Sequence, residues 1–334
     1  MSRITISAPP VSRAVSEAHH LVVRAFASFV LDLKERLDAL SAEEYARIEA
    51  EAVKDDLSDE HKVPTNLIPF STYARCEWQA FKKMEAIRRL QVENPHRSGA
   101  GRWGGQELAQ FRQKRKRGTV FNYFVRLHLD EFLEKHPELE RIDWERSCVL
   151  TFKSKNSRVV GFTSTIDFVL LFRDGVEIGF EIKDKGRSLE FGGKSWIWVH
   201  DYLTLKYYTL FFDEVFVLNV RPSNRHFSRL VLSDEKREAL LQKLADVVER
   251  FDEESYLKPA LHYCDYCDLG RARKCPIKAL RDRYGTKKLS EVVKAGKLIF
   301  EFVHHLEEQP ELVERLVEVE AVEEVALEEI ALGG

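Results

Sequence analysis

The sequence predicts an α/β (α+β) protein in which a central sheet is flanked by helices. From Cys148 to Val220 the chain runs through short apolar segments rich in β-branched and aromatic residues, such as CVLTFK. Segments on both sides place apolar residues at helical spacing, as in AHHLVVRAFASFVLDL. A length of 334 residues and a hydrophobic fraction of 44% are sufficient for a buried core.

The expected elements follow in chain order. Residues 11–60 are predicted to be helical, with a capping box from Ser41 to Glu44, before VPTNLIPFS interrupts the pattern. A helix is expected near Ser71, a loop at ENPHRSGAGRWGG, and further helix through residues 106–136. Strands are expected at CVLTFK, VGFTSTIDFVLLF, VEIGFEIK and EVFVLNV, and helices at 201–212, at 233–251 and after Pro276. The chain then becomes acidic to its last residue.

Composition limits the classes of partner. The net charge of −3 means that any binding of nucleic acid must come from a local basic patch. No apolar run approaches the roughly 18 residues of a membrane span, and the N-terminal residues lack the apolar core of a signal peptide. We therefore expect a cytoplasmic protein.

The turn between two expected strands decides which side chains face each other in FTSTIDFVLLFRDGVEIGFEIKDK. A two-residue turn would put Asp167 opposite Ile182 and mix apolar with polar positions. A three-residue turn, Arg173 to Gly175 with Gly175 in the left-handed conformation, separates them. This second register produces an apolar face from four facing pairs, Phe172–Val176, Leu170–Ile178, Phe168–Phe180 and Ile166–Ile182.

The same register places Asp167 opposite Glu181, with Lys183 next along the strand. Facing residues have Cβ atoms about 5 Å apart, and two carboxylates that close repel unless a cation lies between them. Mg²⁺ and Mn²⁺ favour such oxygen ligands, and Lys183 could hold a water molecule or offset charge on a phosphate. The alternative is a surface ion pair between Glu181 and Lys183, which the preceding Asp and the apolar flanks make less favourable.

An Asp on one strand followed by Glu-x-Lys on the next resembles the PD-(D/E)XK nuclease superfamily. The resemblance implies a catalytic, cation-binding set of Asp167, Glu181 and Lys183 on a restriction-endonuclease-like core with a central mixed sheet. Members often carry Gly-x-x-x-His on the preceding helix, the His being a metal ligand. This chain has Gly118 and Asn122 at those positions, so Asn122 is the candidate auxiliary ligand.

RecB-like members of that superfamily often show Gln-x-x-x-Tyr on the helix after the motif. Here the matching positions are Thr204 and Tyr208, so the Tyr is present and the Gln is not. The resemblance implies that Tyr208 contacts DNA, whereas packing in the core is the alternative for an aromatic residue on a helix.

The cysteines follow a spacing typical of a metal centre. Cys264, Cys267 and Cys275 lie within HYCDYCDLGRARKCP, and a fourth thiolate must come from Cys76 or Cys148. Cys148 lies in an expected strand and is interpreted as a core residue, which favours Cys76. Sulfur ligation of this kind suits both zinc and iron–sulfur clusters.

One cysteine before the nuclease motif and three after it resembles the iron–sulfur RecB-like nucleases, which include the CRISPR-associated Cas-four exonucleases and AddB-type helicase–nucleases. The resemblance implies a [4Fe-4S] cluster held by Cys76, Cys264, Cys267 and Cys275, with zinc as the other occupant. It also implies an N-terminal helical region (1–62), a nuclease core (63–278) and a helical, acidic C-terminal tail (279–334).

Several residues are candidates for DNA binding. Lys114, Arg115, Lys116 and Arg117 form a basic run that could contact phosphates, or could be a solvated helix face. Lys194 and Trp196 follow the motif, where an aromatic residue beside a cation could stack on unpaired bases, or could belong to the core.

We therefore expect a metal-dependent DNA nuclease. The resemblance implies action on single-stranded ends, in CRISPR spacer acquisition with Cas-one and Cas-two type integrase partners. The alternatives are a RecB-like DNA repair nuclease, a catalytically impaired DNA-binding or scaffold subunit, and a zinc-stabilised binding module.

Overall fold

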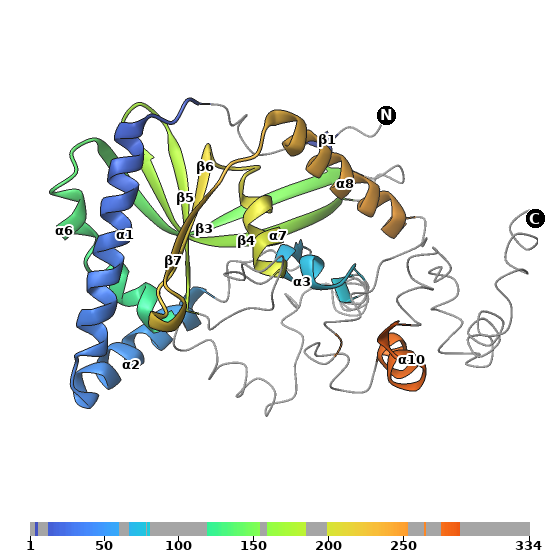
Figure 1. The fold of residues 1–334 in the computed structure, drawn as a ribbon, viewed down its shortest axis with the longest axis horizontal. Helices are drawn as coiled ribbons and strands as arrows, with labels where there is room; N and C mark the ends of the chain where they lie inside the picture. Colours follow the sequence, from blue (N-terminus) through green and yellow to red (C-terminus); the bar gives the residue numbers. More distant parts are fainter. Residues whose placement is uncertain are drawn as a thin grey trace, which may run out of the picture.

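The computed structural model describes residues 4–5, 13–59, 67–77, 79–80, 119–153, 159–184, 199–252, 264 and 275–287. These residues form a seven-stranded sheet with strand order β1-β3-β4-β5-β6-β7, and β2 pairs with β4 (Figure 1). The strands are β1 (Ile4–Thr5), β2 (Leu67–Pro69), β3 (Leu139–Lys153), β4 (Val159–Phe172), β5 (Glu177–Lys183), β6 (Glu214–Asn219) and β7 (His226–Leu230). The pairs β2–β4 and β5–β6 are parallel and the others antiparallel, so the sheet is mixed.

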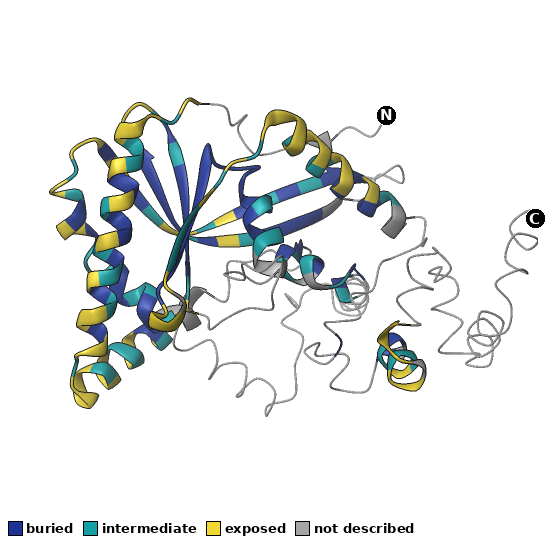
Figure 2. Cartoon of the chain, viewed as in Figure 1, coloured by how far each residue is buried: buried dark blue, intermediate teal, exposed yellow. Residues whose placement is uncertain are grey.

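Helices cover both faces of this sheet, which confirms the predicted fold class (Figure 1). The helices are α1 (Glu17–Asp38), α2 (Ala42–Asp59), α3 (Phe70–Arg75), α6 (Leu129–Leu133), α7 (Val199–Tyr208), α8 (Asp234–Asp252) and α10 (Pro276–Tyr284). Residues 119–126 are also helical. In Figure 2 the strands are largely buried, and exposed residues concentrate on the helices. No described helix has the length and apolar character needed to cross a membrane.

Most boundaries agree with the sequence patterns, but four strands differ, of which the short β1 was not predicted. The strand β3 begins at Leu139 and not at Cys148, because its charged first half pairs with β4. The segment VPTNLIPFS contains β2, which pairs with β4 and ends at Pro69. The edge strand β7 was not predicted from HFSRL, whose residues are only partly buried.

The N-terminal helix α1 belongs to the core of the sheet. Ser16 caps it, since the His19 backbone N–H donates to Ser16 Oγ at 3.4 Å. Its apolar positions recur at helical spacing and are buried together with residues of β4 and β5. The Phe26 ring is fully buried, with its centroid 4.9 Å from that of Phe180 and 5.8 Å from that of Phe168. The helix α1 therefore packs in the same apolar cluster as buried residues of β4, β5 and β6.

The second face is covered by α3, α7 and α8. The Tyr207 ring stacks on Phe70 with 4.0 Å between centroids, and its hydroxyl donates to the Phe162 carbonyl at 2.9 Å. The side chains of α7 thus attach directly to β4, which carries Asp167.

The packing of α1 predicts a matched pair of mutational effects. Phe26→Ala should lower the free energy of unfolding by about 3–5 kcal/mol, because it leaves a cavity between α1 and the sheet. Leu21→Ala, on the same helix but 59% exposed, should change it by no more than about 0.5 kcal/mol. Urea unfolding measures both values, and similar effects of the two substitutions would contradict the packing of α1 on the sheet.

Candidate active site

The hairpin between β4 and β5 has the predicted register. Phe168 pairs with Phe180 and Leu170 with Ile178. The Phe172 N–H donates to the Val176 carbonyl at 2.9 Å, which closes a three-residue turn. Gly175 in this turn has a φ of +87°, in the left-handed region that glycine adopts without strain. The three-residue interpretation of RDG is confirmed.

One residue of the predicted apolar face lies on the opposite side. Phe168 packs in the cluster under α1, as expected, but Ile166 belongs to the cluster under α7. The pairing of β3 with β4 is interrupted between these two residues, because it skips Glu145 and Asp167. Glu145 has a φ of +49°, which is uncommon for a non-glycine residue. The irregularity changes the side-chain alternation of β4 at Asp167.

Beyond the pair Phe168–Phe180, the hydrogen bonds between β4 and β5 run from backbone N–H groups to carboxylate side chains. The Ile182 N–H donates to Asp167 Oδ2 at 2.7 Å, and the Asp167 N–H donates to Glu181 Oε2 at 3.3 Å. Asp167 and Glu181 are therefore brought together as the facing register predicts, and each is held by a main-chain donor of the other strand.

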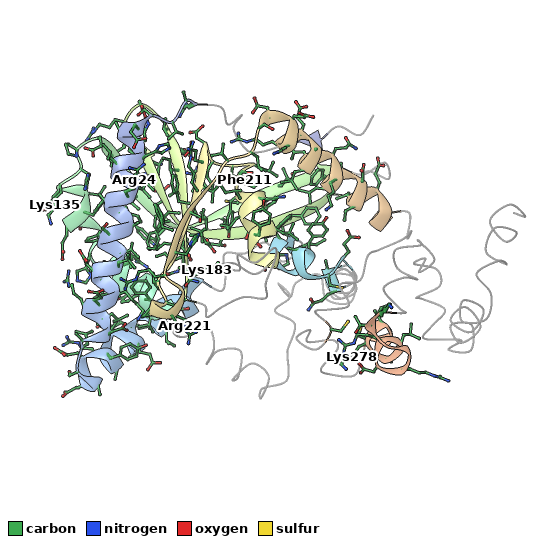
Figure 3. The ribbon with its side chains drawn as sticks, viewed as in Figure 1. Arg24, Lys135, Lys183, Phe211, Arg221 and Lys278 are labelled. Carbon is green, nitrogen blue, oxygen red and sulfur yellow. The ribbon has the colours of Figure 1, made fainter. Side chains whose placement is uncertain are left out.

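Lys183 and Asn122 complete this cluster. Lys183, the last residue of β5 and labelled in Figure 3, forms an ion pair with Glu181 Oε1. The Asn122 amide, from the helical residues 119–126, donates to Asp167 Oδ1 at 2.7 Å. Asn122 thus meets Asp167 through its nitrogen, and its amide must turn over before its oxygen can face a cation.

Burial dominates the electrostatics of the cluster. It raises the pKa of Glu181 to about 7, and the nearby Asp167 charge contributes in the same direction while Lys183 opposes it. Burial also raises the pKa of Asp167, opposed by Lys183, the Ile182 N–H and Asn122. The buried Glu181 and the partly buried Asp167 carboxylates therefore lie near one ammonium group, an arrangement that an added positive charge would stabilise.

The donor chemistry fits a hard divalent cation. Across the described ranges, no three or more His, Cys, Asp and Glu side chains gather as a potential metal site. Mg²⁺ and Mn²⁺ do not require such a cage, because they are usually bound by one or two carboxylates together with water and substrate phosphates. Asp167 and Glu181 supply that pair.

Tyr208 lies in the core and not at the predicted DNA surface. It is 1% exposed, and its hydroxyl donates to the Thr165 carbonyl at 2.5 Å, with Ser164 Oγ 2.9 Å away. Burial raises the pKa of Tyr208 well above its usual value, so the phenol stays neutral. The reason for the difference is that the tyrosine side chains at the end of α7 extend to β4, where the Tyr208 hydroxyl reaches the strand just before Asp167.

The described cysteines lie in one apolar cluster. Cys264 and Cys275 are buried in the core under α7, and the partly buried Cys76 packs against it. Cys148 is 2% exposed, as expected of a core residue, and burial raises the pKa of its thiol. The remaining predicted residues lie outside the described ranges, namely Cys267, Lys114, Arg115, Lys116, Arg117, Lys194 and Trp196.

A pocket beside Asp167 was not predicted from the sequence. Its lining includes Arg126, Trp144 and Glu145 as well as Asn122 and Asp167. The sequence offered one sign of this pocket. In the charged stretch RIDWERS, the large aromatic Trp144 lies between polar residues, at a position where an exposed surface is expected.

Comparison with solved structures finds neighbours of low sequence identity, among them the following two. No family model and no curated protein matches the chain. The crystal structure of SSO0001 covers 72% of this chain and 98% of its own, with 16% identity and a TM-score of 0.41. The alignment with a candidate exonuclease from Eubacterium rectale covers 70% of this chain and 92% of that protein, with 10% identity and a TM-score of 0.32. Similarity at this level decides neither the family nor the activity of this chain.

The raised pKa of Glu181 predicts how stability depends on pH in cation-free buffer. The folded protein holds this proton up to about pH 7, whereas the unfolded chain releases it near 4.5, so the free energy of unfolding should fall across that interval. Glu181→Gln removes this contribution and should flatten the decline. Urea unfolding at several pH values tests it, with the exposed Glu235→Gln as control. An unchanged decline in Glu181→Gln would contradict the shift.

Proposed function

We propose that this protein is a metal-dependent nuclease that hydrolyses phosphodiester bonds in DNA. The observation that carries the proposal is the meeting of Asp167, Glu181 and Lys183 where the β4–β5 ladder ends. A structural ion pair alone would require one carboxylate and one ammonium group. A second carboxylate close to the buried Glu181 raises the free energy of the protein without a cation, as expected of a cation site.

The residues have distinct parts in this proposal. Asp167 and Glu181 would hold Mg²⁺ or Mn²⁺, with Asn122 as an auxiliary ligand once its amide has turned. A bound cation supplies charge neutralisation at the scissile phosphate and lowers the pKa of a water molecule. The Lys183 ammonium group would separate from Glu181. It would then orient the attacking water or stabilise negative charge on the phosphate. The low exposure of the Glu181 side chain, 6%, strengthens these interactions because water is excluded.

The proposed substrate is DNA with single-stranded ends, in CRISPR spacer acquisition with integrase partners or in DNA repair. Both roles follow from the resemblance of the motif and the cysteine spacing. A catalytically impaired DNA-binding subunit is the second candidate. It is favoured by the hydrogen bond from Asn122 to Asp167, which occupies a carboxylate oxygen at the position where related nucleases present a His.

Cleavage assays separate these candidates. With Mn²⁺, the wild-type protein should cleave labelled single-stranded DNA. The cleavage rate of Lys183→Ala should be lower by a factor on the order of 100 or more. Lys236→Ala, an exposed lysine on α8, is the matched control and should retain full activity. Equal inactivity of wild type and Lys183→Ala would reject the nuclease and leave the binding subunit.

We further propose that Cys76, Cys264, Cys267 and Cys275 hold a [4Fe-4S] cluster, with zinc as the alternative occupant. Cys76, Cys264 and Cys275 come from distant parts of the chain and contribute to one apolar cluster. Within the part of the chain that the structure describes they do not form a ligand group, so binding requires them to converge together with Cys267. Such a centre would join the two ends of the core and stabilise it.

Metal analysis tests the cysteine site. Protein purified without oxygen should contain iron and acid-labile sulfide and absorb visible light, and Cys76→Ala should lose both. Cys148→Ala, in the same apolar cluster, is the matched control and should keep its iron. Zinc without iron would identify the other occupant, and loss of iron from Cys148→Ala alone would contradict the choice of ligands.

A further inference from the structure

A pocket adjoins Asp167, and its lining includes neither Glu181 nor Lys183. Its walls come from the helical residues 119–126, from β3 and from β4. The lining consists of Thr119, Asn122, Tyr123, Arg126, Trp144, Glu145, Asp167 and Phe168. Asn122 and Asp167 belong to both the pocket and the proposed catalytic cluster, so a group bound at this pocket would lie next to that cluster.

Trp144 gives the pocket an exposed aromatic wall. Its side chain is 44% exposed, which is unusual for so large an apolar group in a central part of a strand. The Arg126 guanidinium lies 4.3 Å from the Trp144 ring centroid and 5.9 Å from the Tyr123 ring centroid. The guanidinium covers one face of the indole, and a flat aromatic ligand can stack on the exposed outer surface of this pair.

The charges of the lining select the kind of ligand. Arg126 is opposed by two carboxylates, Glu145 and Asp167, so the pocket does not favour a phosphate. The Glu145 carboxylate can instead accept a hydrogen bond from an exocyclic amino group of a base. The φ of +49° at Glu145 costs free energy that its surroundings must offset, and such strain in a β-strand is commonly found at binding sites.

We propose that one unpaired nucleobase of the DNA strand binds at the open mouth of this pocket, whose enclosed space is only about 20 Å³, and that it stacks on the Trp144–Arg126 pair and hydrogen-bonds to Glu145. The proposal rests on the nuclease function and deepens it, because it explains a preference for single strands. A base within a duplex is paired and stacked and has to be extruded before it can enter such a pocket, whereas a single-stranded base is already available. The site selects unpaired substrate, while Asp167 and Glu181 act on the backbone.

Binding measurements without cleavage test the pocket. The two ligands are a short fluorescent oligodeoxycytidylate and an abasic oligonucleotide of the same length. They carry the same charge, but only the first has bases. In metal-free buffer with chelator, the wild-type protein should bind the first more tightly. Trp144→Ala should weaken its binding about 5- to 100-fold and leave the abasic strand unaffected. Trp144→Phe should retain most of the preference.

Leu127→Ala is the matched control, because Leu127 is 52% exposed, lies close to Arg126 in sequence and is not part of the pocket lining. It should bind both strands as the wild-type protein does, and equal melting temperatures of the variants would show that each is folded. Equal affinity of the wild-type protein for the two strands, no binding of either, or an unchanged preference in Trp144→Ala would overturn the pocket. Failure of the proposed nuclease function would give a different result. The protein would then cleave no DNA but would still bind the strand with bases more tightly than the abasic strand.

Discussion

The arrangement of the candidate site depends on the hydrogen bond from the Ile182 N–H to the Asp167 carboxylate. In a regular antiparallel ladder this donor would be met by a backbone carbonyl. Here the strand pairing between β3 and β4 skips Glu145 and Asp167, and a side-chain oxygen accepts the bond at 2.7 Å. The strands stay together through their acidic side chains, so the charges cannot turn outward to solvent without loss of this contact.

Packing on both faces holds β4 in that position. On one face, the Tyr208 hydroxyl bonds the Thr165 carbonyl, close to the irregularity. On the other, Phe26 of α1 contacts the Phe168 ring, and Asn122 reaches the Asp167 carboxylate. Residues that contact no substrate therefore set the geometry of the charged groups. A buried carboxylate pair needs this rigid support, because a flexible site would admit water and let the two charges separate.

The charge balance explains why the site is suited to a cation. Lys183 neutralises Glu181 in the absence of metal, and the raised pKa of both carboxyls reflects their burial. A divalent ion competes with protons and with Lys183 for the same oxygen atoms. In the proposed mechanism, cation binding would release the ammonium group from Glu181 toward the substrate and so couple the two events. Lys183 would then serve as a counter-ion in the metal-free state and as a catalytic group in the metal-bound state.

Much of this site could be predicted from the sequence, because register is a local property. The choice of a three-residue turn followed from Gly175 and the alternation of apolar residues, and it correctly brought Asp167 to Glu181. The side of Ile166 could not be predicted, because it depends on the left-handed conformation of Glu145 in a neighbouring strand. The burial of Tyr208 and the pocket at Trp144 likewise arise from tertiary packing, to which a helical pattern or a lone aromatic residue gives no guide.

The most direct test of the shared cation site is anomalous X-ray scattering from crystals grown with Mn²⁺. We expect a manganese peak within bonding distance of oxygen atoms from both Asp167 and Glu181, with the Lys183 ammonium displaced from Glu181. The same peak should be absent from crystals of Asp167→Asn. A wild-type crystal soaked in Mn²⁺ that shows no peak there, with Lys183 still paired to Glu181, would contradict the account.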